Sequence, residues 1–360
     1  KHDLNVMAGY ENYLMNSETL SAARTQYELT EYPYLNVGPE DYQTNAGSGS
    51  EFTSNSFFGR VMYSYDDRYL VQANVRHDGS SRFARKYRWG TFPSASAGWV
   101  ISKEKWMQSA APYLSFMKLR ASWGLTGNNR TTTPYDFYSQ IATLPGHNQS
   151  YDYVFGGEFV SGYAPTNMMN DKLRWETTEQ WNVGLDFSVF DSRIKLTADW
   201  YLKNTRDLLL EATMPSSSGY TTAMMNVGSM QNKGFEVTLD LVPVQKKNFT
   251  WNMNFNIAVN RNKVTALTND QYSLLRSVSW DQRFNAQYPY ITQVGKPSGM
   301  MYGFIYEGTY KPEEFNAGGT SLKDGIAYMT SVGQDKVRPG DPKYRDINKD
   351  GLIDDNDRTV

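Results

Sequence analysis

Apolar and polar side chains alternate strictly along most of this sequence, as they do in β-strands whose two faces meet different surroundings. Several alternating runs continue for about ten residues, whereas strands of soluble sheets are commonly about five or six residues long. A strand of about ten residues, tilted by about 45°, spans a bilayer. The apolar positions expected to face lipid are Val183, Leu185, Phe187, Ile194, Leu196, Phe235, Val237, Phe255 and Ile257, and the polar positions expected on the opposite face are Asn252, Asn254 and Asn256.

The connections between these runs alternate between short and long. Tight turns are expected at 66–67, 191–192 and 246–248, and long stretches at 128–178, 207–231 and 262–284. Short turns at one end of a sheet and long loops at the other are typical of outer-membrane barrels. The sequence therefore predicts an all-β fold, an antiparallel transmembrane β-barrel with long extracellular loops. Alternation by itself also fits a soluble sandwich.

Composition excludes several other classes of protein. The 36 basic and 38 acidic side chains leave a net charge of -2, which argues against a nucleic-acid binder. The absence of cysteine excludes disulfides, thiolate zinc sites and a cysteine nucleophile, and the three histidines lie too far apart for local metal-binding pairs. No apolar run reaches the roughly 18 residues of a transmembrane helix, and no signal peptide is visible. We therefore do not expect an enzyme.

One motif indicates a metal site. Residues 346–357 match the calcium-loop pattern D-x-[DN]-x-[DN]-G-x5-E, except that aspartate replaces the final glutamate. Gly351 permits the sharp bend of such a loop. The expected calcium ligands are Asp346, Asn348, Asp350, Leu352 through its carbonyl, Asp354 and Asp357. The alternative is an acidic surface turn that holds no metal.

Other polar segments suggest anchoring or substrate contact. The run "HDGSSRF" at 77–83 holds His, Asp and Ser, but its place at a predicted strand end favours a loop anchor over a hydrolase site. Aromatic side chains beside amides in the long loops suit stacking and hydrogen bonding to sugars or extended peptides. The candidate substrate-binding residues are Tyr138, Tyr151, Tyr153, Trp280 and Tyr288.

Several long motifs resemble one family. The run "RYLVQANVRHDGSSRFARKYRWGTFPSASAGWVISKEKWM" is followed by "MKLRASWGLTGNN", then by "YEGTYK" and by "GDPKYRDINKDGLIDDNDRTV". In this order they are similar to the barrel of SusC-like (RagA-like) TonB-dependent outer-membrane transporters. The resemblance implies a barrel of about 22 strands with an internal plug in the outer membrane of a Gram-negative cell, its loops extracellular. Residues 1–360 would supply roughly 10 to 12 of these strands.

The resemblance also implies partners and a task. Such a transporter imports a glycan or a peptide, is covered by a SusD-like surface lipoprotein, and is driven by TonB, ExbB and ExbD. Residues 1–360 are expected to be part of a single barrel domain, as a fragment without the plug, the TonB box and the final strands. The rival interpretations are an extracellular β-rich adhesin or glycan-binding surface protein, and a hydrolase, which would need a pair of carboxylates in a cleft.

Overall fold

The structure is a computed structural model, and the residues that it describes fall into two compact units, Lys1–Arg261 and Asn262–Val360. No helix among the described residues is both long and apolar enough to span a bilayer. The expectation of a single barrel domain stays a prediction. The described residues are 1–28, 30–32, 34–142, 153–160, 162–267, 272–276, 289–318 and 320–360.

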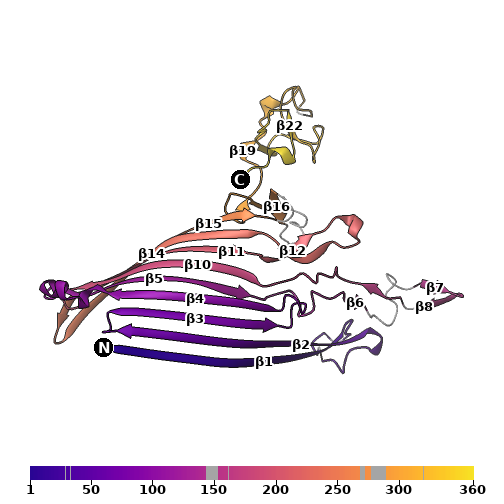
Figure 1. Cartoon of the computed structure of the whole chain (residues 1–360). Coiled ribbons are helices and arrows are strands. Elements are labelled where there is room, and N and C mark those ends of the chain that lie inside the picture. The colour runs from indigo at the N-terminus through magenta and orange to yellow at the C-terminus, as the bar shows by residue number, and fades with distance from the viewer. Residues whose placement is uncertain are drawn as a thin grey trace. The chain divides into compact units, whose positions relative to one another are not determined.

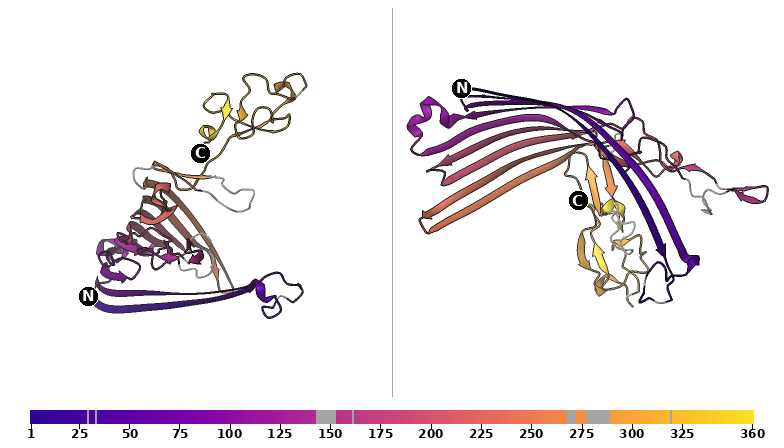
Figure 2. Two further views of the ribbon diagram at one scale, coloured as in Figure 1. Left: turned by 90° about the vertical axis from the view of Figure 1, so that its right-hand side faces the viewer. Right: turned by 90° about the horizontal axis from the view of Figure 1, so that it is seen from below.

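Nine long strands form one sheet in which neighbours in the sequence are neighbours in space (Figure 1). Every described register between them is antiparallel, and the sheet is curved (Figure 2). The strands are β1 (His2–Arg24), β2 (Gln43–Tyr65), β3 (Tyr69–Ser80), β4 (Trp89–Val100), β5 (Leu114–Asn128), β10 (Glu176–Val189), β11 (Ile194–Arg206), β14 (Ser229–Lys246) and β15 (Phe249–Ala266).

The antiparallel order sends successive connections to opposite ends of the sheet. One end holds the predicted tight turns: at Asp66 and Asp67 the φ angles are 53° and 52°, and the Arg68 N–H donates to the Tyr65 carbonyl at 3.0 Å. Such left-handed turns match the right-handed twist of a hairpin. The β4–β5 connection at this end is longer and contains the 3-10 helices η2 (Ile101–Lys103) and η3 (Lys105–Ala110). All the long loops of the sheet start from the other end.

The long sheet has nine strands within the described residues, and the family resemblance implies roughly 10 to 12 for the whole chain. The other described strands are only two to five residues long, because the loops and the second unit lack sustained alternation. In the loops they are β6 (Ile141–Ala142), β7 (Tyr153–Phe155), β8 (Glu158–Val160), β9 (Ala164–Pro165), β12 (Leu209–Thr213) and β13 (Thr222–Asn226), with the 3-10 helices η1 (Glu40–Tyr42) and η4 (Ser216–Ser218).

The long loops have a hydrophobic core of their own. Phe83 from the β3–β4 loop, Phe137 and Leu173 from the β5–β10 loop and Leu209 in β12 are all buried against one another. Trp175 packs on this cluster, and its indole N–H donates to the Arg88 carbonyl at 2.9 Å. Three loops are therefore held together by apolar packing above the end of the sheet.

The second unit, Asn262–Val360, packs around Tyr310, Phe315, Leu322 and Val337. Its short strands β20 and β22 pair in parallel, and Ile353 of β22 is fully buried. The elements here are β16 (Ser273–Arg276), β17 (Tyr290–Gln293), β18 (Met300–Met301), β19 (Tyr306–Thr309), β20 (Tyr328–Met329), β21 (Pro342–Tyr344) and β22 (Leu352–Ile353), with the 3-10 helices η7 (Pro312–Glu314) and η8 (Asp355–Asp357).

Candidate functional site

One face of the long sheet is apolar, and no other element in the described part of the chain covers it. Apolar residues on neighbouring strands lie opposite one another on this face. Val183 of β10 pairs with Trp200 of β11, and Trp200 pairs with Phe235 of β14. These side chains remain 45%, 43% and 49% exposed, as expected of a surface that packs against something other than this chain. Leu185 and Phe187 of β10 continue the same face.

The opposite face is polar, as the alternation predicts. The Asn254 side-chain amide donates to the Asp240 carboxylate at 2.6 Å, which places both side chains on this face. Because successive residues of a strand point to opposite sides, Asn252 and Asn256 share it, while Phe255 and Ile257 belong to the apolar face. The predicted division of these residues between two faces is confirmed.

Tryptophans on the apolar face bind carboxylates near both ends of the sheet. The Trp99 indole N–H donates to Glu104 near the short-turn end, and the Trp123 indole N–H donates to Glu179 toward the loop end, both at 3.0 Å. An apolar ring with a satisfied polar tip is the arrangement that aromatic side chains take at membrane interfaces.

A charged clamp crosses the polar face. The Arg120 guanidinium on β5 donates two hydrogen bonds to Asp186 on β10, at 2.8 and 3.0 Å, and one to Asp199 on β11, at 3.1 Å. Gly184 makes the room, because a Cβ there would lie 2.4 Å from the Asp199 carboxylate and 2.7 Å from Arg120. One side chain thus ties three adjacent strands together through charge-assisted hydrogen bonds.

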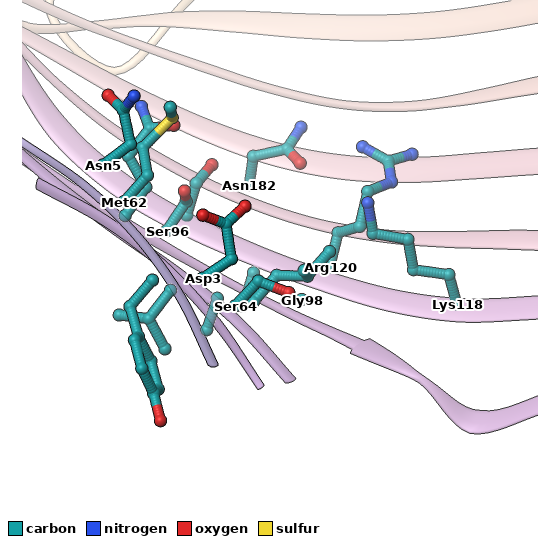
Figure 3. A pocket seen from close by; sticks show the side chains of 16 residues that line it. Asp3, Asn5, Met62, Ser64, Ser96, Gly98, Lys118, Arg120 and Asn182 are labelled. Carbon is teal, nitrogen blue, oxygen red and sulfur yellow. The ribbon is translucent and has the colours of Figure 1, made fainter. Parts of the chain in front are cut away.

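A hollow of about 490 Å³ lies beside this clamp. Asp3, Gln72, Lys118, Arg120 and Asn182 are among its lining residues, and Figure 3 shows Asp3, Asn182, Lys118 and Arg120 projecting from the same side of the sheet. Within the described residues Lys118 makes no ion pair, whereas Arg120 is fully engaged. The polar lining of this hollow therefore offers amides, hydroxyls and the ammonium group of Lys118 to whatever fills the space in front of it.

A hydrogen-bond network fixes the short-turn end. Glu104 accepts from the Tyr69 hydroxyl at 2.6 Å, from Trp99 and, at 3.2 Å, from Arg68, which also pairs with Asp66 at 2.9 Å. The bond from Tyr69, followed by that from Trp99, lowers the pKa of the Glu104 carboxyl. The hydrogen bond from Arg68 likewise lowers the pKa of Asp66. One carboxylate thereby joins the β2–β3 turn to the 3-10 segment after β4.

The "HDGSSRF" segment anchors loops, as the sequence predicts. Arg82 donates to the Asn129 carbonyl at 3.4 Å, and its guanidinium lies 4.6 Å from the centre of the Phe52 ring. Ser80 accepts from the Asn129 amide at 3.0 Å. These contacts join the starts of two loops.

Of the five candidate substrate-binding residues, Tyr138 and Tyr153 lie within the described part of the chain. Tyr138 is 56% exposed and its ring lies 4.0 Å, centre to centre, from that of the buried Phe137. Tyr153 begins the short strand β7. Tyr151, Trp280 and Tyr288 lie outside the described residues. Substrate contact by these five stays a prediction.

In the acidic loop 346–357, backbone N–H groups donate hydrogen bonds to the loop's own carboxylates. Asp346 accepts from the N–H groups of Lys349 and Gly351 at 2.6 and 2.8 Å, and the buried Asp357 accepts from three backbone N–H groups. Gly351 has a φ of 85°, which confirms the expected bend. In the described residues no three His, Cys, Asp or Glu side chains stand where they could jointly hold a metal ion. Calcium binding by this loop stays a prediction.

Sequence reasoning did not identify Glu104, Arg120, Asp186 or Asp199. Arg120 and the two aspartates do occupy polar positions of alternating runs, which places them on the inner face. Their meeting depends on the register of β5, β10 and β11, which no local pattern specifies. Glu104 lies in a polar connection between runs, and its three donors come from β3, β4 and a turn.

A curved antiparallel sheet with an uncovered apolar face, a polar face, tight turns at one end and long loops at the other defines the wall of an outer-membrane barrel. The family model for the β-barrel of TonB-dependent receptor-like proteins matches residues 2–346. The chain belongs to this family, whose members are outer-membrane receptors and not enzymes.

Relatives and solved structures agree with this assignment. The TonB-dependent receptor P39 of Formosa agariphila is 31% identical over 385 residues, which cover 100% of this chain and 35% of that protein. The TonB-dependent receptor SusC of Bacteroides thetaiotaomicron is 38% identical over 214 residues, 59% of this chain and 21% of that protein. A structure of the RagAB peptide importer in its closed-closed state superposes with a TM-score of 0.73 at 25% identity, over 88% of this chain and 34% of that one. The chain spans about a third of the length of the P39 receptor.

We expect Leu196→Lys to lower the free energy of unfolding by about 2–4 kcal/mol, because it places a charge on the lipid-facing side of β11. The matched control is Thr197→Lys, one residue along and on the polar face, which should cost much less. Urea titration of the full-length protein folded in phospholipid bilayers measures both. Equal costs for the two variants would contradict the assignment of the faces.

Glu104→Gln is expected to remove a dependence on acid pH at the short-turn end. In the parent protein the pKa of Glu104 lies below the usual glutamate value of 4.5. The stability that its ionised carboxylate contributes is therefore fully present above pH 4.5, and it is lost as the pH falls through the lowered pKa of the folded state. Hydrogen exchange of residues 101–113 in the full-length protein, corrected for intrinsic rates, should show protection that falls as the pH drops below 4.5. The variant should lack this fall, while the exposed control Glu18→Gln keeps it. A parent with flat protection over this range would refute the role of Glu104.

Proposed function

We propose that the protein of which this chain forms a part is a TonB-dependent importer of the outer membrane. The observation that supports this most strongly is the two-faced sheet, matched over residues 2–346 by the family's barrel. An apolar face suits lipid, and the polar face suits a passage that admits a hydrated solute. Energy would come from TonB, ExbB and ExbD, acting through parts of the transporter that lie outside this chain.

A membrane barrel also has to be closed, and the nine strands do not close one. β1 and β15 are the outer strands of the sheet, and within the described residues neither has a strand on its outer edge. Unpaired backbone groups are too costly in lipid, so further strands must complete the wall. The need for further strands is consistent with the length of this chain, which spans about a third of the P39 receptor.

The cargo is proposed to be a peptide or an oligosaccharide, delivered beneath a SusD-like surface lipoprotein. The similarity to the RagAB peptide importer favours a peptide, and the similarity to SusC favours the same class of transporter without fixing its cargo. The polar inner face, with its amides and hydroxyls, suits either.

Uptake measurements test this function. Cells that carry the full-length protein should deplete a peptide mixture or an oligosaccharide mixture from the medium, and loss of TonB should reduce the rate to that of cells without the transporter. Equal uptake with and without TonB, or a full-length protein that stays in aqueous buffer without detergent, would contradict the proposal and favour a surface adhesin.

We further propose that residues 346–357 bind one calcium ion. The chain already follows the course that such a loop needs: Gly351 bends it, and β22 pairs with β20 directly after the bend. Calcium would draw the side-chain oxygens of Asp346, Asn348 and Asp350 inward in place of their present backbone partners. Its role would be to hold this loop rigid.

Calcium at about 100 times its dissociation constant should oppose local unfolding of this loop by about 2.7 kcal/mol, which corresponds to about 100-fold slower cleavage by protease. A chelator should abolish this protection in the full-length parent, and Asp346→Ala with Asp350→Ala should abolish it without a chelator. Asp324→Ala, an exposed residue of the same unit, is the control. Cleavage that does not respond to the chelator would favour the metal-free acidic turn.

A further inference from the structure

A hollow of about 370 Å³ lies at the short-turn end of the long sheet, where β11 meets β14. β11 begins at Ile194, opposite Leu241, whereas β14 runs on to Lys246. This difference in length leaves a step beside the turn from β10 to β11, and the hollow occupies it. Its lining residues are Phe190, Arg193, Ile194, Leu241, Val242 and Pro243.

This hollow does not owe its exposure to an edge of the sheet. Its walls come from the β10–β11 turn, from β11 and from β14, and each of these strands has a neighbour on both sides within the sheet. Strands that complete the barrel would pair with β1 or β15 and would leave these neighbours unchanged. The hollow therefore belongs to the wall itself.

The apolar walls of the hollow continue the lipid-facing side of the sheet. Ile194 and Leu241 are cross-strand partners, and further along the same strands Leu196 and Leu239 are partners on the same side. The Phe190 side chain is half exposed at the turn. A hollow with such walls suits part of a lipid acyl chain, because apolar surface of both the chain and the protein is then removed from water.

Phe190 is an unusual residue for its position in the turn. The backbone there is left-handed at three successive residues, since the φ angles of Phe190, Asp191 and Ser192 are 54°, 53° and 63°. Asp and Asn tolerate this backbone, whereas a bulky side chain rarely adopts it. The Phe190 N–H donates to the carbonyl of Tyr113, whose side chain is also exposed, at 2.9 Å. Two exposed aromatic side chains therefore come from adjoining segments at this end, as expected at a membrane interface.

Arg193 supplies a cation to the hollow. Its Nε donates to the Val242 carbonyl at 3.1 Å, and its Nη2 donates to the Pro243 carbonyl at 2.8 Å. The guanidinium has further N–H donors, and among the described residues no carboxylate pairs with it. The two bonds to carbonyls fix its orientation and leave the other donors for an anion. Its planar fork matches the oxygens of a phosphate.

The other charges near the hollow also favour an anion. Lys246 and Lys247 follow in the turn after β14, are exposed, and make no ion pair with any residue that the structure describes. Asp191 in the neighbouring turn is exposed as well, but Asp240 lies on the polar face of the sheet. Cations therefore outnumber carboxylates around the hollow.

We propose that this hollow is a binding site for an anionic glycerophospholipid of the periplasmic leaflet. Outer-membrane barrels have their short turns on the periplasmic side, so the hollow lies level with the headgroups of that leaflet. The lipid phosphate accepts hydrogen bonds from Arg193, and one acyl chain runs along Phe190 and Ile194 towards the apolar face. Lys246 and Lys247 favour an anionic headgroup over a zwitterionic one. The site involves neither the cargo nor TonB, so it goes beyond the proposed function.

Native mass spectrometry of the full-length protein, stripped of lipid and titrated with phosphatidylglycerol, tests this site. Arg193→Gln should raise the dissociation constant of the tightest-bound lipid by about tenfold, because the phosphate loses its charged donor while Gln can still donate to the carbonyls. Phe190→Asn should also weaken binding, and it spares the turn because Asn tolerates left-handed backbone. Arg85→Gln is the matched control, since it removes an exposed guanidinium at the loop end and should leave binding unchanged.

Phosphatidylcholine separates recognition of the headgroup from burial of the acyl chains, since it carries the same phosphate beside a quaternary ammonium group. The parent should bind it more weakly than phosphatidylglycerol, and Lys246→Gln with Lys247→Gln should narrow the difference. Equal affinity of the parent for the two lipids, or parental affinity in Arg193→Gln, refutes the site and leaves only non-specific contact with bulk lipid. Neither result bears on uptake, so the proposed function would stand.

A photoreactive amino acid in place of Phe190 identifies the occupant of the hollow in intact cells. Crosslinking to a phospholipid, read from the mass of the adduct peptide, supports the proposal. Crosslinking to a periplasmic protein or to another segment of the transporter overturns it.

Discussion

The constraint on which this structure depends is that backbone N–H and C=O groups in lipid must find their partners within the protein. The hydrogen bonds between antiparallel strands satisfy this constraint. The register of these strands in turn determines which side chains lie on each face of the sheet. Once Val183 is opposite Trp200 and Trp200 is opposite Phe235, a slip of one residue in β11 would send its apolar side chains to the polar side. The register is therefore specified by the difference between lipid and water more than by any single side-chain contact.

The same ladder explains why charge is tolerated on the inner face. Asp186 and Asp199 lie on neighbouring strands, and ionised carboxylates this close would repel each other without Arg120 between them. Gly184 lets the guanidinium reach both, so a residue without a side chain is as much a part of the clamp as the three charges. All three charged groups are between about one-fifth and one-third exposed, so water shares in their stabilisation.

Local patterns predict the parts of this molecule that are themselves local. The long strands, their two faces and the turns at Asp66 and Asp191 follow from alternation and from residues that tolerate left-handed backbone. The clamp around Arg120, the network around Glu104 and the packing of Phe83 against Leu173 unite segments far apart in the sequence, so no pattern within one segment specifies them. Within the described residues the stretches after β15 form strands of only two to four residues, which no sustained alternation marks in the sequence.

The loops of this barrel wall differ from one another in how they are held. Those around Phe83 and Leu173 share a buried core, and Arg82 joins their bases, so the entropy lost in ordering them is offset by apolar packing. By contrast, the described part of the β1–β2 loop has no buried cluster of its own, and its Tyr32, Tyr34 and Tyr42 side chains are exposed. The wall thus holds some of its loops by apolar packing, whereas the aromatic side chains of another loop remain on its surface. This difference follows from where apolar side chains fall in the loops: inward at positions 83, 137 and 173, and outward at positions 32, 34 and 42.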